Sequence, residues 1–288
     1  MSAGSVVGAE PLGIIAGGGD LPLRVAEAAA AAGRPVHVVV LEGQGDPGAF
    51  SAFPHVVLRF GLAATMLRWL REAGARQIVL AGRVTRPSIL SLRPDGAGMS
   101  LLSRIGRAAF RGDDSILSAV IRVLREDGFE VLGAQHVLED LLPPPGLLAG
   151  EAPGEAAHAD IARGVAVCRA LGAVDVGQAC VVQQGLVLAV EAIEGTDAML
   201  ARSAALRRDG PPGVLVKCVK PGQSRLADLP TIGPATVRGA AAAGLAGLAF
   251  EANGTIVMDR AGTLAAARAA GLFVLAFDAE TVLKETET

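Results

Sequence analysis

The segment from residue 217 to 233 has the most unusual chemistry of the chain. A predicted strand over residues 214–219 leads into it, and Pro221, Gly222 and Pro230 constrain its backbone. Its charged and amide side chains are Lys217, Lys220, Gln223, Arg225 and Asp228. Loops with constrained backbones on rigid scaffolds are where functional residues concentrate. A purely structural loop would not need two lysines and an arginine beside an aspartate, so we interpret this segment as functional.

A glycine loop is the second candidate. Gly17, Gly18 and Gly19 lie with Asp20 between a predicted strand over residues 12–16 and a predicted helix over residues 21–32. Glycine lets the backbone approach a ligand, and a helix N-terminus offers free N–H groups to an anion. The run is neither the GxGxxG pattern nor a P-loop. A tight turn is the alternative, but three successive glycines exceed what a turn requires, so we favour a phosphate or nucleotide site.

An arginine loop follows the predicted buried strand over residues 78–81, with Gly82, Arg83 and Arg86. In open parallel sheets, ligands bind at the C-terminal ends of the strands. Two arginines there could hold a diphosphate or a uracil carbonyl. A solvated loop explains the motif equally well.

Two groups of acids could bind a metal ion. Asp113 and Asp114 precede a predicted helix over residues 115–127, and adjacent carboxylates can bind Mg²⁺ through water. The alternative for Asp114 is a helix N-cap. Glu194 and Asp197 flank Gly195 and Thr196 between a strand and a helix, where an acid also complements the helix dipole.

The elements that position these residues predict an α/β protein of two domains. Strands alternate with helices in the first half, which predicts a Rossmann-like domain with a parallel sheet over residues 1–138. Prolines and glycines interrupt the pattern, so we place a linker at residues 139–154. Residues 155–288 are expected to form a mixed α/β domain that is catalytic. The dipeptides Gln184-Gly185 and Asn253-Gly254 each predict a hairpin there.

Composition narrows the function further. There are 26 basic and 29 acidic residues, so the basic excess typical of nucleic-acid binding is missing. Three cysteines without CxxC spacing suit a reducing compartment. The first residues lack a signal-peptide pattern, and the apolar stretches fall short of the ~20 residues of a membrane span. We therefore expect a soluble, cytoplasmic protein.

The motifs together resemble the LpxI-type UDP-2,3-diacylglucosamine pyrophosphatases of lipid A biosynthesis. The similarity runs in family order through nearly the whole chain, and the second half carries its most specific pieces, EGTDAML and KPxQ…DLPxIG. The matching stretches are GIIAGGGDLP (13–22), AGRVTRP (81–87), RGDD (111–114), DVGQ (175–178), GLVLAVEAIEGTDAML (185–200), KPGQ (220–223) and DLPTIG (228–233).

The resemblance implies Mg²⁺-dependent hydrolysis of a diphosphate between two domains, giving UMP and 2,3-diacylglucosamine 1-phosphate. The family's essential aspartate falls on Asp228, which would bind the metal ion or take a proton. With the motifs above, the expected metal ligands are Asp228, Asp113, Asp114 and Glu194. The expected substrate-binding residues are Gly17, Gly18, Gly19, Asp20, Gly82, Arg83, Arg86, Thr196, Asp197, Lys217, Lys220, Gln223 and Arg225. The chain departs from the family at Leu226, usually Arg, and at Ser224, commonly a carboxylate.

The resemblance also implies partners. The substrate would be an acylated nucleotide-sugar, its lipid part implies transient contact with the inner-membrane surface, and the family implies a homodimer. A nucleotide-sugar binding protein without turnover is one alternative. A Rossmann-type oxidoreductase is another, with Glu42 placed to bind a ribose, although the glycine pattern is wrong for it.

Overall fold

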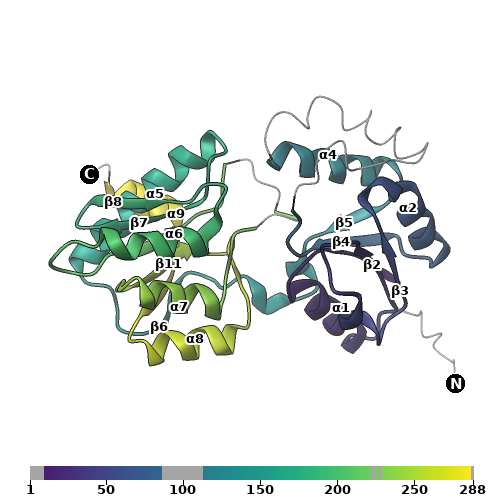
Figure 1. The fold of residues 1–288 in the computed structure, drawn as a ribbon, viewed down its shortest axis with the longest axis horizontal. Helices are drawn as coiled ribbons and strands as arrows, with labels where there is room; N and C mark the ends of the chain where they lie inside the picture. The colour runs from purple at the N-terminus through teal and green to yellow at the C-terminus, as the bar shows by residue number, and fades with distance from the viewer. Residues whose placement is uncertain (1–9, 86–112, 222–224, 227–228, 287–288) are drawn as a thin grey trace, which may run out of the picture. The chain divides into compact units, whose positions relative to one another are not determined.

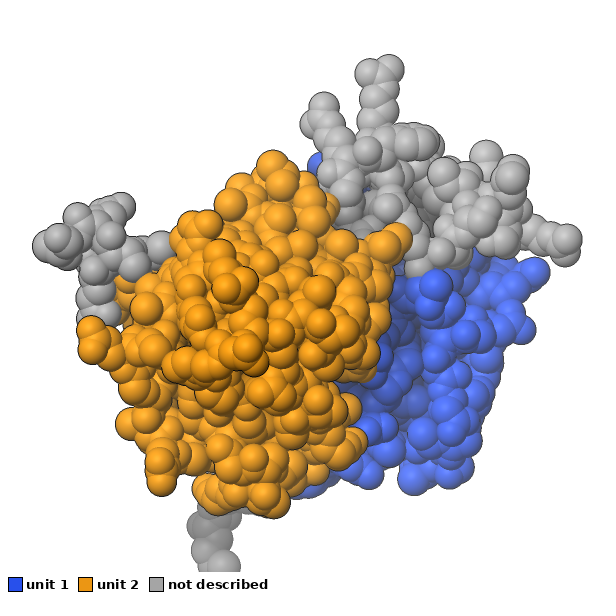
Figure 2. Space-filling model, turned by 60° about the vertical axis from the view of Figure 1, so that its left-hand side comes forward, with its two compact units in different colours: residues 1–138, 224–228 blue, residues 139–223, 229–288 orange. Residues whose placement is uncertain are grey.

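The chain forms two compact units in a computed structural model that describes residues 10–85, 113–221, 225–226 and 229–286. Of residues 113–116, 139 and 283–286 only the backbone is described. Unit 1 comprises Met1–Leu138 and Ser224–Asp228, and unit 2 comprises Glu139–Gln223 and Leu229–Thr288 (Figure 2). The chain therefore passes from unit 1 to unit 2 at residue 139, returns briefly after residue 223, and ends in unit 2.

Unit 1 is built on a parallel five-stranded sheet in the order β3-β2-β1-β4-β5 (Figure 1). Valine-rich strands such as VHVVVL in β2 pack well in a sheet buried on both faces. The strands are β1 (Leu12–Ala16), β2 (Val36–Leu41), β3 (His55–Leu58), β4 (Gln77–Ala81) and β5 (Glu130–Leu132). The helices are α1 (Leu21–Ala31), α2 (Ala63–Glu72) and α4 (Asp113–Glu126), with short 3-10 turns at Pro47–Phe50, Phe60–Leu62 and Ala134–His136. The predicted parallel sheet of the first half is confirmed.

The strand order of unit 1 has a switch point between β1 and β4. From β1 the chain builds β2 and β3 on one side, and then crosses to build β4 and β5 on the other. Loops after β1 and β4 therefore leave the sheet side by side, at the edge where open α/β sheets bind ligands.

Unit 2 is built on a mixed six-stranded sheet in the order β6-β13-β11-β9-β7-β8. The inner strands β9, β11 and β13 are parallel, whereas β6, β7 and β8 run antiparallel to their neighbours. The strands are β6 (Gly146–Ala149), β7 (Ala179–Gln183), β8 (Leu186–Val190), β9 (Val214–Lys217), β11 (Gly247–Glu251) and β13 (Phe273–Phe277). The mixed α/β character predicted for the second half is confirmed.

Helices cover both faces of this sheet. On one face, α5 (Glu155–Ala173) and α9 (Ala279–Thr286) close a core that contains Val165, Val216 and Phe273. On the other, a larger core contains Leu200, Leu215 and Phe250 beneath α6 (Gly195–Ser203), α7 (Pro234–Ala242) and α8 (Arg260–Ala269). Successive residues Leu215 and Val216 of β9 thus enter opposite cores, as the alternation of a strand requires.

One predicted hairpin is confirmed and the other is wrong. Strands β7 and β8 pair antiparallel around Gln184-Gly185. Asn253 does adopt the left-handed conformation that its turn signal predicts, with φ 53°. However, β11 has parallel partners on both edges, so the strand after Asn253 cannot pair with it. Instead β12 (Ile256–Val257) pairs in parallel with β10 (Thr231–Ile232) in a separate two-stranded sheet.

The segment expected to be a linker, residues 139–154, contains ordered elements of unit 2. A 3-10 turn at Glu139–Leu141 precedes the prolines, and β6 then pairs antiparallel with β13 at the edge of the sheet. Pro143 also contributes its carbonyl, which accepts a hydrogen bond of 2.9 Å from the N–H of Asn253. Within the described ranges, no helix combines the length and the apolar character needed to cross a membrane.

Candidate functional site

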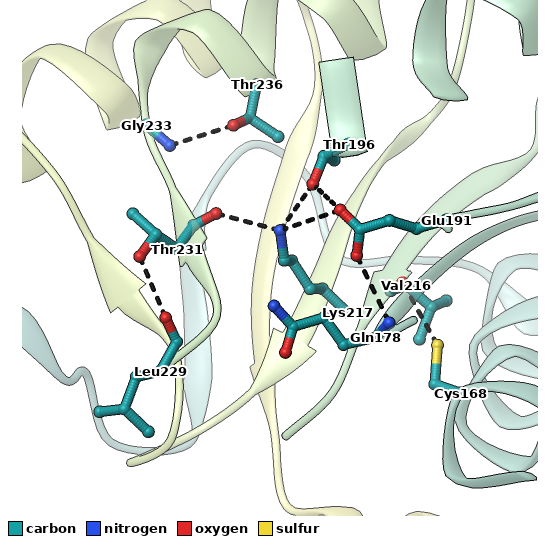
Figure 3. A network of polar contacts seen from close by, with 10 residues as sticks. All are labelled: Cys168, Gln178, Glu191, Thr196, Val216, Lys217, Leu229, Thr231, Gly233 and Thr236. Atoms are coloured by element: carbon teal, nitrogen blue, oxygen red, sulfur yellow. Dashed lines mark hydrogen bonds and ion pairs between the residues drawn. The ribbon is translucent and has the colours of Figure 1, made fainter. Parts of the chain in front are cut away.

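The Lys217 ammonium is the centre of a buried polar network in unit 2 (Figure 3). Lys217 ends β9, and its side chain is 5% exposed. Its Nζ donates hydrogen bonds to Thr196 Oγ1 at 2.7 Å and to the carbonyl oxygen of Thr231 at 3.2 Å. Glu191 Oε1 lies 3.9 Å from the same nitrogen. The strands β9 and β10 and the helix α6 are therefore joined through one side chain.

Glu191 supplies the negative charge of this network. It follows β8, and its side chain is 10% exposed. Its Oε1 accepts the Thr196 hydroxyl, and its Oε2 accepts the N–H of Gln178 at 3.4 Å. Burial lowers the pKa of Lys217 below its ordinary value of 10.5, while the charge of Glu191 opposes that shift. The carboxylate thus compensates an ammonium that would otherwise be costly to bury.

Two further contacts fix the chain just after Lys217. The N–H of Val219 donates to Glu251 Oε2 at 3.0 Å, and Arg169 Nη2 lies 3.4 Å from the other oxygen of that carboxylate. Lys220 Nζ contacts Asp175 Oδ1 at 2.8 Å. The segment of residues 217–220 therefore contacts three acids, Glu191, Glu251 and Asp175.

The acids at the start of α6 have separate contacts. Glu194 Oε1 lies 2.8 Å from Arg202 Nη2, and this hydrogen bond lowers the pKa of Glu194 below 4.5. Asp197 lies exposed in the first turn of the helix. Among the residues whose placement is described, no three His, Cys, Asp or Glu side chains gather in a way that could hold a metal ion.

In unit 1, the glycine loop and the arginine loop hold each other. Gly17 N–H donates to the carbonyl of Ala81, and Gly18 and Arg83 exchange two backbone hydrogen bonds, all at 2.8 Å. A Cβ on Gly17 would lie 2.5 Å from the carbonyl oxygen of Arg83. Gly82 has φ 94°, and a Cβ on it would lie 2.7 Å from the carbonyl oxygen of Gly18. This close backbone contact is a reason for Gly17 and Gly82 that requires no ligand, and at Gly18 a Cβ would lie 2.9 Å from the carbonyl oxygen of Gln44.

Gly19 and Asp20 differ from the other residues of this loop. Gly19 has φ 86°, and a Cβ there would meet open space. Asp20 precedes α1 without a side-chain hydrogen bond to the helix. These two positions, with the exposed Arg83, are where the loop presents a surface at the edge of the sheet.

Arg225 and Leu226 belong to unit 1 although they follow the Lys217 segment in sequence. The carbonyl of Arg225 accepts a hydrogen bond of 2.8 Å from Gln135 Nε2. Leu226 packs on the unit 1 core and borders a hollow on α4 with Ile121 and Arg122. Leu226 therefore contacts the apolar core of unit 1 on one side and a hollow lined largely by polar and charged residues of α4 on the other.

Several expected site residues are not tested by the structure. Arg86, Gln223 and Asp228 lie outside the described residues, as do Ser224 and the side chains of Asp113 and Asp114.

Comparison with known proteins decides the family. The LpxI N-terminal domain matches residues 11–141, and the LpxI C-terminal domain matches residues 144–275. The chain belongs to the LpxI family. It is 42% identical to the UDP-2,3-diacylglucosamine pyrophosphatase LpxI of Caulobacter vibrioides over 275 residues, which cover 93% of this chain and 98% of that protein. The resemblance found from the motifs is confirmed.

Among solved structures, this chain has a distant likeness to a GalE-like L-threonine dehydrogenase from Cupriavidus necator in its holo form. The sequences are 11% identical, the match covers 95% of this chain and 88% of that chain, and the TM-score is 0.32. This likeness supports no conclusion about the chain.

The sequence motifs did not point to the acids that contact the cations. Glu191, Asp175 and Glu251 were not among the candidates, yet each contacts the segment from 217 to 220. Glu191 follows the apolar strand β8, and Glu251 is the last residue of the apolar strand β11. An acid at the end of an apolar strand was the sequence signal that could have identified them. The cation that each of these acids contacts depends on the order of the strands in the sheet, which the sequence does not reveal.

Proposed function

We propose that this chain hydrolyses the diphosphate of UDP-2,3-diacylglucosamine to UMP and 2,3-diacylglucosamine 1-phosphate. The observation that carries the proposal is its 42% identity, over both domains, to the Caulobacter protein named UDP-2,3-diacylglucosamine pyrophosphatase. The nucleotide-sugar would bring negative charge, and the chain offers the cations Arg83 and Lys220 in loops after strands. Arg86, Gln223 and Arg225 complete the set that we propose for substrate binding.

Asp228 is the proposed catalytic residue. It stands three residues before Thr231, whose carbonyl Lys217 binds. A carboxylate in this position would accept a proton from the attacking water, a role that commonly contributes about 10²–10⁴-fold to rate.

Mg²⁺ is the proposed cofactor, and the described carboxylates do not form its site. Glu194 is paired with Arg202, Glu191 contacts Lys217, and Glu251 contacts Arg169. The remaining expected metal ligands are Asp228, Asp113 and Asp114, and we propose that these residues would hold the ion. When bound, such an ion neutralises a diphosphate and lowers the pKa of a coordinated water.

The test is UMP release from UDP-2,3-diacylglucosamine with Mg²⁺, with EDTA, and with the variant Asp228→Asn. We expect turnover by the wild-type chain, loss of turnover with EDTA, and a fall of about 10²-fold or more in Asp228→Asn. Asp209→Asn is the matched control, because Asp209 is exposed and its carbonyl rather than its carboxylate makes the contact with Gln184. Tight substrate binding without UMP release would instead support a non-catalytic nucleotide-sugar binding protein.

Location and assembly follow from the same proposal. An acylated substrate favours a cytoplasmic protein that touches the inner-membrane surface transiently, and the family favours a homodimer. Co-sedimentation with anionic vesicles that carry the substrate, and light scattering of the purified chain, measure the two properties separately. Absence of vesicle binding, or the mass of one 29.1 kDa chain, would contradict the corresponding part.

A further inference from the structure

We propose that Lys217 is a positioning residue that ties the segment of residues 229–233 to the central sheet of unit 2, and that it does not bind substrate phosphate itself. Glu191 and Thr196 hold it in that position. The kinetic part of this inference rests on the proposed function, whereas its structural part does not.

The first observation is that the donors of the ammonium are used within the protein. A lysine has three N–H donors. Two reach Thr196 Oγ1 and the Thr231 carbonyl, and the Glu191 carboxylate lies 3.9 Å from the same nitrogen as an ion-pair partner. The residue is 4% exposed. A phosphate could reach Nζ only by displacing one of these partners and opening a buried network.

The second observation is that Thr196 has a defined direction in the network. Its hydroxyl accepts from Lys217 and donates to Glu191. A hydroxyl can do both at once, whereas a methyl group in its place can do neither. Thr196 therefore links Glu191 to the Lys217 ammonium by two hydrogen bonds, in addition to the direct ion pair between Glu191 and Lys217.

The third observation concerns what the ammonium holds. Thr231 begins β10, a strand of two residues whose sheet partner is the equally short β12. Two-stranded pairs this short have little stability of their own. Ile256 N–H donates to the Pro230 carbonyl at 2.8 Å, and Gly233 N–H donates to Thr236 Oγ1 at 3.3 Å at the start of α7. Figure 3 shows the Thr231 carbonyl directed at Lys217, which joins this small sheet to β9 of the large one.

The consequence for chemistry comes from sequence adjacency. Lys217 fixes the carbonyl of Thr231, and Asp228 stands only three residues before Thr231 in the sequence. We therefore expect this contact to restrict the chain next to the proposed catalytic aspartate. Displacing a catalytic group by about 1 Å can cost about 10²-fold in rate. Removing the tie should therefore lower kcat and leave substrate affinity largely intact, because no substrate contact is lost.

The kinetic experiment measures kcat and KM for UMP release in Lys217→Met, Thr196→Val, Thr196→Ser and the control Arg268→Met. Arg268 is an exposed cation near the end of α8 and tests the loss of one positive charge at a distance. We expect kcat to fall roughly 10- to 100-fold in Lys217→Met and Thr196→Val, with KM within about threefold of wild type. Thr196→Ser keeps the hydroxyl and should turn over at least about tenfold faster than Thr196→Val.

The structural experiment is amide hydrogen exchange of the same variants, followed by mass spectrometry of peptides that cover residues 229–236. We expect faster exchange there in Lys217→Met and Thr196→Val, and wild-type exchange in Arg268→Met. This arm needs no turnover, so it tests the tie even if the wild-type chain releases no UMP, a result that would overturn the proposed function alone.

The outcomes that would overturn the inference are specific. A rise in KM of tenfold or more at unchanged kcat in Lys217→Met, with unchanged exchange over residues 229–236, would make Lys217 a substrate contact. Should Lys217→Met fail to fold, the comparison of Thr196→Val with Thr196→Ser decides. Equal kcat and equal exchange in those two variants would then rule the positioning role out.

Discussion

Glu251 Oε2 accepts the backbone N–H of Val219 at 3.0 Å, so the end of the central strand β11 fixes the loop that leaves its neighbour β9. The contact is buried, and Arg169 lies 3.4 Å from the second oxygen of the same carboxylate. A backbone N–H left without an acceptor in such a place loses its water without compensation.

Glu251→Leu should therefore destabilise unit 2 by about 1–3 kcal/mol, because it leaves the Val219 N–H unpaired and Arg169 without its carboxylate. Glu251→Gln should cost less, since an amide oxygen can still accept from Val219. Urea denaturation of both variants measures the difference. Equal losses in the two variants would mean that the charge, and not the hydrogen bond, matters at this position.

Gly82→Ala should destabilise unit 1 more than Gly33→Ala. Both glycines have positive φ, 94° and 78°, so an alanine is strained at either position by about 1–2 kcal/mol. Only at Gly82 would the added Cβ also meet backbone, 2.7 Å from the Gly18 oxygen, whereas at Gly33 it meets open space. We expect an additional loss of about 1–3 kcal/mol for Gly82→Ala in denaturant unfolding. Similar losses would show that the two crossing loops can move apart at little cost.

The three cysteines should not react with a thiol reagent in the folded protein. Cys168, Cys180 and Cys218 are at most 1% exposed, and the Sγ atoms of the first two lie 3.6 Å apart. Contact with Cys168 and burial raise the pKa of the Cys180 and Cys218 thiols above 9.0, whereas the hydrogen bonds from Cys180 and Cys218 lower the pKa of Cys168 to about 5. Burial, which keeps the reagent away from the sulfur, is therefore what protects Cys168. An aromatic disulfide reagent should thus label no thiols in buffer and three in 6 M guanidinium. Rapid labelling of the native chain would contradict this burial.

Arg202→Met should raise the pKa of the Glu194 carboxyl toward 4.5. The hydrogen bond from Arg202 is the largest cause of its lowered value in the wild-type protein. An NMR titration of the side-chain carboxyl carbon of Glu194, in both proteins, measures the shift directly. An unchanged titration midpoint would show that the ion pair does not persist in solution.

The stability of the wild-type chain relative to Lys217→Met should rise with pH between the lowered folded-state pKa of Lys217 and its ordinary value of 10.5. The folded-state pKa of Lys217 is lowered by burial, whereas in the unfolded chain its pKa stays near 10.5. Between these two pKa values the unfolded state binds more protons, so the free energy of unfolding increases with pH. Lys217→Met lacks this group, and the titrating groups that do not interact with Lys217 cancel in the comparison. Urea unfolding at several pH values from 7 to 10 measures the trend, and a constant difference would mean that the ammonium keeps its ordinary pKa.

Much of the fold was determined by local sequence. Apolar runs such as VHVVVL, alternating with amphipathic helices, fix the parallel sheet of unit 1, because strands and helices of that kind have few other ways to bury their faces. The turn at Gln184-Gly185 fixes the β7–β8 hairpin, since its residues accept positive φ. The motifs in order along the chain also determined the family.

Tertiary structure decided what the local patterns left open. Asn253-Gly254 makes its turn, yet β11 is flanked by β9 and β13, and only the order of the sheet excludes the hairpin. Lys217 was recognised as unusual from its neighbours, but its partner Glu191 follows β8, and Thr196 and Thr231 come from α6 and β10. The sequence determines the charge of a side chain. Whether that charge contacts a ligand or a buried carboxylate depends on which strands are neighbours in the sheet.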